Sequence, residues 1–184
     1  MRTFIFILSA ALTLLSCADN PGIAELPRTS GQLAFVSTVS ASIQSLSDDK
    51  IIEGDTGGAI NFELSNSDIA AKGILEFPDT CFQNQEQIFV SVPEAVEGVA
   101  ALDLNPIKLI FKKPIFLTLK YSGLNIKEGD IINFNCINKK GDMVDVEYRK
   151  LIIDYDDGWA LVVNAKLYQF SRVGFTRRIG ANRL

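Results

Sequence analysis

The sequence contains no histidine. Histidine completes Ser-His-Asp and Cys-His nucleophile pairs, ligates zinc and is the commonest general base, so its absence argues against most hydrolase mechanisms. Lys and Arg total 18 against 22 Asp and Glu, a net charge of −4. Nucleic-acid binding needs clustered cations, so we expect no nucleic-acid partner. We also expect no enzymatic activity, no metal site and no cofactor.

The sequence also lacks an apolar run long enough to cross a membrane. After the basic start Met1-Arg2-Thr3, the run Phe4–Leu15 has twelve residues, with only Ser9 and Thr13 as polar interruptions. A transmembrane helix needs about 20 apolar residues, so this run is typical of the hydrophobic part of a signal peptide. We therefore predict export from the cytoplasm.

The end of this run resembles the lipobox of bacterial lipoproteins, in the four residues Leu14-Leu15-Ser16-Cys17. The resemblance implies that residues 1–16 are a cleaved signal peptide and that Cys17 carries the lipid that anchors the protein in the membrane. The alternative is an ordinary secretory signal that happens to contain a cysteine. Ala18 stands where an inner-membrane retention signal would have Asp, which favours the outer membrane of a Gram-negative bacterium.

Residues 17–31 are predicted to be the lipidated cysteine and a flexible tether. They contain Pro21, Gly22, Pro27 and Gly31, and no aromatic residue. Residues 32–184 then form one domain, whose size allows it to bury enough surface to fold alone.

This domain is predicted to be all-β. Apolar and polar residues alternate repeatedly, as in Ile60, Phe62 and Leu64, and glycine-containing turns such as Asp156-Asp157-Gly158 separate the segments. Only Pro93–Leu104 is expected to form a helical turn or two. The predicted strands are Gln32–Val39, Ile60–Leu64, Gly73–Phe77, Gln87–Val92, Ile107–Phe111, Ile115–Tyr121, Ile131–Ile137, Met143–Arg149, Leu151–Tyr155 and Trp159–Asn164.

Residues 57–175 resemble the ZU-five domain, a family named from zonula occludens proteins and netrin receptors. The similar segments are Gly57–Phe62, Ile74–Pro78, Pro106–Tyr121 with its central Phe111-Lys112-Lys113-Pro114, and Gln169–Phe175. The chain departs from the family pattern around Thr80-Cys81 and at Gln169, where the family has histidine. The resemblance implies an antiparallel β-sandwich that works as an interaction or structural module of the cell envelope, with a protein or glycan as its partner.

Two other functions stay open as alternatives. Some ZU-five relatives cleave themselves at a Phe-Ser bond, which corresponds here to Phe170-Ser171. The base in those relatives is the adjacent histidine, and because Gln169 cannot accept a proton near neutral pH, we predict that the bond stays intact. The second alternative is a carbohydrate-binding sandwich that uses Trp159 or Tyr155, although the parity of Trp159 with Leu161 and Val163 favours core packing.

Two cysteines remain besides Cys17. Cys81 and Cys136 could form a disulfide in an oxidising compartment. Cys136 is also in phase with Ile132 and Phe134 on a predicted buried face, where a free thiol would behave as a small hydrophobe. The sequence leaves both possibilities open.

Three sets of charged residues could have a function, but a structural role is the preferred interpretation of each. Asp154, Asp156 and Asp157 could suggest a calcium loop, but Asp-Gly between two apolar alternations indicates a hairpin turn. The cations Lys166, Arg172, Arg177, Arg178 and Arg183 could meet anionic lipid or an acidic partner, but a solvated, partly frayed terminus is expected. Glu63 and Glu76 could form an acid/base dyad only if the fold brings them together.

Overall fold

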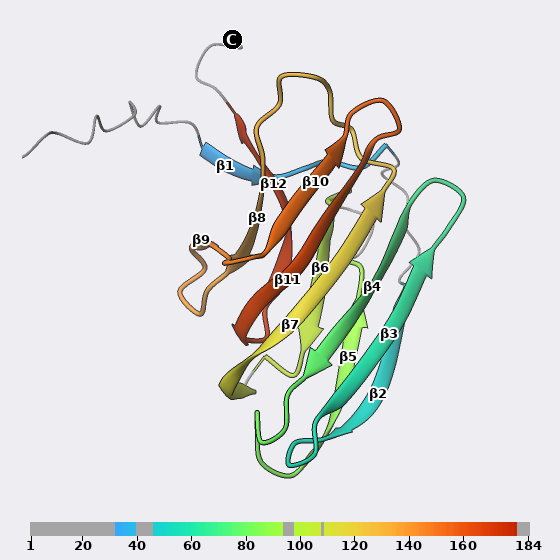
Figure 1. The fold of residues 1–184 in the computed structure, drawn as a ribbon. Coiled ribbons are helices and arrows are strands. Elements are labelled where there is room, and N and C mark those ends of the chain that lie inside the picture. The colour runs from blue at the N-terminus through green and yellow to red at the C-terminus, as the bar shows by residue number, and fades with distance from the viewer. Residues whose placement is uncertain (1–31, 40–45, 94–97, 108, 180–184) are drawn as a thin grey trace, which may run out of the picture.

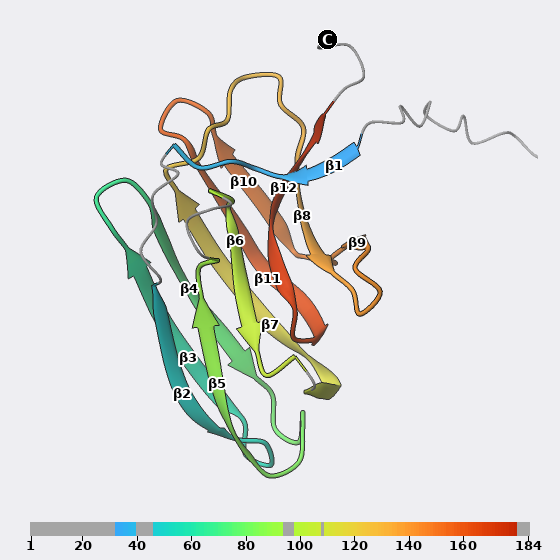
Figure 2. The ribbon, with the colours of Figure 1, turned by 180° about the vertical axis from the view of Figure 1, so that it is seen from behind.

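The computed structural model describes residues 32–39, 46–93, 98–107 and 109–179. Within these ranges the regular structure consists of twelve β-strands, paired antiparallel in two sheets that pack face to face (Figures 1 and 2). The predicted all-β antiparallel sandwich is thus confirmed. No helix that could cross a membrane occurs among the described residues. Cys17, the signal peptide and the tether lie outside them.

The five-stranded sheet follows the alternation expected from the sequence. Buried and exposed residues alternate along β3, so that Ile60, Phe62 and Leu64 point into the sandwich while Asn61 and Glu63 face solvent. The strands, in their order across the sheet, are β10 (Lys150–Asp154), β11 (Trp159–Gln169), β7 (Ile110–Ser122), β4 (Ala70–Phe77) and β3 (Gly58–Ser65).

The seven-stranded sheet is organised around β12 (Arg172–Ile179). This strand pairs with β8 on one side, and on the other side with β6 through residues 172–174 and with β1 through residues 176–179. The full order is β2 (Ser47–Glu53), β5 (Gln85–Ser91), β6 (Ala101–Asn105), β12, β8 (Ile132–Ile137) and β9 (Met143–Asp145), with β1 (Gln32–Phe35) beside β12.

One end of the core is an aromatic cluster. The Phe111 ring lies edge-on to Phe170, with centroids 4.9 Å apart, and also contacts the rings of Phe77 and Phe82 at 6.4 and 6.2 Å. Edge-to-face geometry is favourable for aromatic pairs. All four rings are buried, so the expected place of Phe111 in the core is confirmed.

The predicted strand Ile107–Phe111 is wrong in its boundaries. Ile107 lies outside any strand with 57% of its surface exposed, and β7 instead runs without a break from Ile110 to Ser122. Pro114, which has no backbone N–H, lies inside β7. β7 pairs with β11 at Ile110 and again from Ile115 onward, and the register shifts between these two points. Pro114 lies in the shifted part, where its lack of an N–H breaks no regular hydrogen bond with β11.

The helical turns expected in Pro93–Leu104 are also wrong for the part that the structure describes. Ala101–Asn105 is the strand β6, whose Leu102 and Leu104 are buried. A β-carbon on Gly174 of the neighbouring β12 would lie 2.3 Å from the Ala100 carbonyl oxygen, so the strands approach closely here. Ala100 and Ala101 are therefore small residues packed against β12. The edge strand β2 was not predicted either.

Candidate functional site

A cleft opens where β12 begins. β12 separates β6 from β8, which places these two strands roughly 10 Å apart. β6 continues past the level of Arg172 to Asn105, whereas β8 ends level with Arg172 at Ile137 and the β8–β9 hairpin continues beyond it. The cleft has a volume of about 470 Å³. Its lining comprises Asp103, Ser171 and Arg172 at the base, Leu104, Asn105 and Ile107 on one wall, and Ile137, Asn138, Lys139 and Gly141 on the other.

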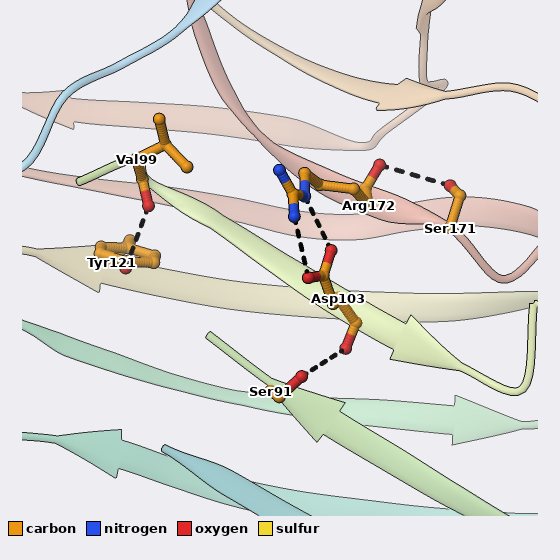
Figure 3. Close-up of polar contacts among 6 residues, drawn as sticks. All are labelled: Ser91, Val99, Asp103, Tyr121, Ser171 and Arg172. Carbon is orange, nitrogen blue, oxygen red and sulfur yellow. Dashed lines mark hydrogen bonds and ion pairs between the residues drawn. The ribbon is translucent and has the colours of Figure 1, made fainter. Parts of the chain in front are cut away.

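The base of the cleft holds a two-point ion pair. Arg172 donates from Nε to Oδ1 of Asp103 at 2.8 Å and from Nη2 to Oδ2 at 3.1 Å (Figure 3). Both side chains are mostly buried, with 27% and 30% of their surface exposed. On the far side of Asp103, the Ser91 hydroxyl donates to the Asp103 carbonyl oxygen at 3.5 Å. The pair joins β6 to β12 and fixes the start of β12.

Ser171 lies next to this ion pair, between β11 and β12. It directly precedes β12 and is only 8% exposed. Its hydroxyl lies 3.3 Å from the Arg172 carbonyl oxygen (Figure 3), one of two acceptors within its reach, the other being the Cys136 sulfur, and the preceding Phe170 is buried in the aromatic cluster. The Phe170-Ser171 bond is therefore held in the crossing from one sheet to the other.

The β8–β9 hairpin forms the second wall. The Asn138 side-chain oxygen accepts the backbone N–H groups of Lys140 and Asp142, at 2.8 and 2.9 Å, which is a common way for asparagine to stabilise a turn. Lys139 is exposed at the tip. Among the described residues no ion pair to Lys139 is found.

A second hollow of about 460 Å³ lies at the other end of β12, lined in part by Asn133, Asp145, Tyr148 and Arg178. Beside it, Thr176 and Asn135 are fully buried: the Thr176 hydroxyl donates to the Asn135 side-chain oxygen, and Asn135 Nδ2 donates to Asp145 at 2.7 Å. The sequence analysis did not identify this network. In the sequence, Asn135 and Thr176 alternate with the buried Phe134 and Phe175, a pattern that is typical of a solvent-exposed strand face.

The acidic segment Asp154–Asp157 is a hairpin turn, as predicted. Asp154 Oδ1 accepts the backbone N–H groups of Asp156 and Asp157 at 3.1 and 2.9 Å. This oxygen is therefore committed to the turn. Across the described residues no cluster of three or more potential metal ligands is present.

Trp159 does not pack in the core, so that prediction is wrong. It lies on the outer face of the five-stranded sheet, because its neighbour Ala160 occupies the buried position opposite Tyr121. The Lys120 ammonium lies 4.2 Å from the ring centroid, a cation–π contact that covers the ring. The Tyr155 hydroxyl donates to the Asp130 carbonyl oxygen at 2.8 Å, and this residue packs against the core.

The basic end is not a frayed terminus over the described residues, which corrects the expectation. Lys166 lies in β11 and pairs with Glu147, a hydrogen bond that raises the pKa of the Lys166 ammonium. Arg172 pairs with Asp103. Arg177 pairs with Asp130 at 3.0 Å. Arg178 is exposed beside the second hollow, and Arg183 lies outside the described residues.

Glu63 and Glu76 are not brought together. Glu63 forms an ion pair with Lys72 on the adjacent strand at 3.0 Å. Glu76 lies four residues further along β4, roughly 13 Å away at the usual strand rise. No acid/base dyad results from this pair.

Cys81 and Cys136 are both free thiols in the structure. Cys81 is fully buried in the loop after β4, and burial raises its pKa. Cys136 lies on β8 opposite Val173 and packs against the core. Burial raises its pKa too, and a hydrogen bond with the Ser171 side chain partly offsets this rise.

Comparisons of the chain with protein-family models, curated proteins and solved structures found no match. The functional argument therefore depends on the chain's own residues.

Proposed function

We propose that this protein is an exported, lipid-anchored, non-enzymatic interaction or structural module of the bacterial cell envelope. The observation that carries the proposal is the four-residue pattern Leu14-Leu15-Ser16-Cys17 at the end of a short apolar run. The absence of histidine supports a binding role over catalysis, because it removes the commonest general base. The lipid on Cys17 would hold the sandwich at the membrane, on the outer membrane by the Ala18 criterion.

The anchoring part is tested by Cys17→Ser in the producing cell. We expect the wild-type protein in the membrane fraction and the variant in the soluble fraction, because the variant lacks the thiol that receives the lipid. Cys81→Ser is the matched control, and this variant should associate with the membrane as the wild-type protein does. Retention of Cys17→Ser in the membrane fraction would contradict the proposal.

The kinship with ZU-five domains is part of the same proposal. It is supported by pairing between two of the similar segments, since Ile74, Leu75 and Glu76 of β4 pair with Thr118, Leu117 and Phe116 of β7. An experimental structure would test it by whether its strand order can be superposed on that of a ZU-five domain.

A further inference from the structure

The cleft at the start of β12 contains polar groups without a partner. The charges of Asp103 and Arg172 neutralise each other, whereas Lys139 makes no ion pair and the half-buried Asn105 side chain makes no hydrogen bond among the described residues. Among the described lining residues there are two cations, Lys139 and Arg172, against one carboxylate, that of Asp103. In a chain whose net charge is −4, this cleft is locally cationic.

Three residues of the lining, Leu104, Ile107 and Ile137, supply apolar surface. Leu104 is buried below the cleft, Ile137 is half-buried in one wall and Ile107 projects from the other with 57% of its surface exposed. A volume of about 470 Å³ lies within the usual range of about 300–1,000 Å³ for small-molecule sites. Such sites combine an apolar lining with a few polar groups that orient the ligand.

An added peptide strand does not suit the cleft. Pro106 has no N–H, and its carbonyl oxygen already accepts from Leu109 at 3.0 Å. On the opposite wall the Asn138 N–H donates to the Asp142 carbonyl oxygen at 2.8 Å. Strand addition needs free main-chain donors and acceptors, so recognition in this cleft depends on side chains.

We propose that the cleft binds a small organic carboxylate with an apolar body. Its carboxylate accepts from the Lys139 ammonium and the Asn105 amide, which stand on opposite walls, and its apolar body packs against Ile107 and Ile137. The inference rests on the proposed function as an interaction module, because it names that module's ligand class.

The place of the cleft suits a ligand that arrives from solution. Gln32, where the described chain begins, pairs with Ile179 at the far end of β12, seven residues from Arg172. That separation is roughly 23 Å at the usual strand rise. A lipid attached through residues 17–31 would therefore meet the domain at the end away from the cleft.

Three probes with one apolar body test the charge preference: 4-phenylbutyrate, 4-phenylbutanol and 4-phenylbutylamine. Calorimetric titration uses the mature chain with Cys17→Ser, so that no attached lipid competes for the apolar lining. We expect the carboxylate to bind roughly tenfold more tightly than the alcohol, because a hydrogen bond to a charged group is worth more than a neutral one. The amine should bind most weakly, and 0.5 M salt should reduce the preference.

Two pairs of variants locate the site. Lys139→Gln should bring the carboxylate to the affinity of the alcohol, while Lys140→Gln, one residue further along the same hairpin, should change the affinity less than twofold. Ile107→Ser should weaken both probes several-fold, whereas Ile110→Ser, which is equally exposed outside the cleft, should weaken neither.

No binding at millimolar carboxylate, equal binding of the acid and the alcohol, or an unchanged preference in Lys139→Gln would overturn the inference. These results are distinguishable from failure of the proposed function. A missing carboxylate site leaves membrane release by Cys17→Ser unaffected, and a membrane test that fails leaves the titration unaffected.

Discussion

The polar residues on the outer faces of the two sheets differ in how exposed they are to solvent. On the five-stranded sheet, Lys72 and Glu63 form an ion pair with 67% and 61% of their side chains exposed. On the seven-stranded sheet, Asn135 and Thr176 occupy comparable outward positions and are both fully buried. Polar groups that are exposed to water contribute little to stability, whereas buried polar groups must be hydrogen-bonded. The seven-stranded sheet therefore depends on particular polar partners.

The largest expected effect is in the core that both sheets share. Phe111→Ala should lower the free energy of unfolding by about 3–5 kcal/mol, because it removes a ring in contact with three other phenylalanines. Chemical denaturation measures the change. Phe89→Ala, a partly exposed residue on the outer face of the seven-stranded sheet, is the control and should cost much less. A near-neutral Phe111→Ala would place this residue outside the core.

The next effect should be confined to the seven-stranded sheet. Gly174→Ala places a β-carbon 2.3 Å from the Ala100 carbonyl oxygen and 2.7 Å from Ala101 Cα, which are backbone atoms with little room to move. We expect a loss of about 1–3 kcal/mol, as for other overpacked sites. In Gly129→Ala no atom lies within 4 Å of the new β-carbon, so only backbone strain of about 1 kcal/mol is expected. Equal losses would show that β6 and β12 can separate.

Removing the Thr176 hydroxyl tests whether the buried polar network stabilises the seven-stranded sheet. Thr176→Val keeps the shape of the side chain but leaves the buried Asn135 oxygen without its donor, which should cost about 1–3 kcal/mol. Thr56→Val, at an exposed turn position, should be close to neutral. If the two variants are equally stable, the Asn135 network does not stabilise the seven-stranded sheet.

The smallest effect should be on the five-stranded sheet. Lys72→Ala breaks the exposed pair with Glu63 and should change stability by at most about 0.5 kcal/mol, an effect that salt reduces further. A loss as large as that of Thr176→Val would remove the contrast between the two outer faces. Denaturation of both variants at low and high salt makes this comparison directly.

How much of the fold could be predicted follows the same division. β3 was predicted from the alternation of apolar and polar residues, and the β10–β11 hairpin from its Asp-Gly turn. Both signals lie within a few consecutive residues of the sequence. β6 was missed because alanines packed against Gly174 look like helix formers, and β2 because Asp48-Asp49-Lys50 hides its single buried residue, Ile52. Trp159 was misplaced because parity alone does not say which face of a strand is buried.

The cleft could not have been predicted from local patterns. Its ion pair joins Asp103 to Arg172 across 69 residues, and its walls are a loop and a hairpin brought together by β12. Arg172 was predicted to belong to a solvated basic end, because its partner lies far away in the chain. Only the strand order brings Lys139 and Asn105, whose side chains have no ion pair or hydrogen bond within the described part of the chain, to the two walls of one cleft.

The intact mass of the protein extracted from membranes tests the central claim most directly. The account predicts a single species that begins at Cys17, carries the added mass of lipid on that residue and runs uncut through Phe170-Ser171. An unlipidated chain would contradict the anchoring. Two fragments divided before Ser171, and abolished by Ser171→Ala, would contradict the non-enzymatic role.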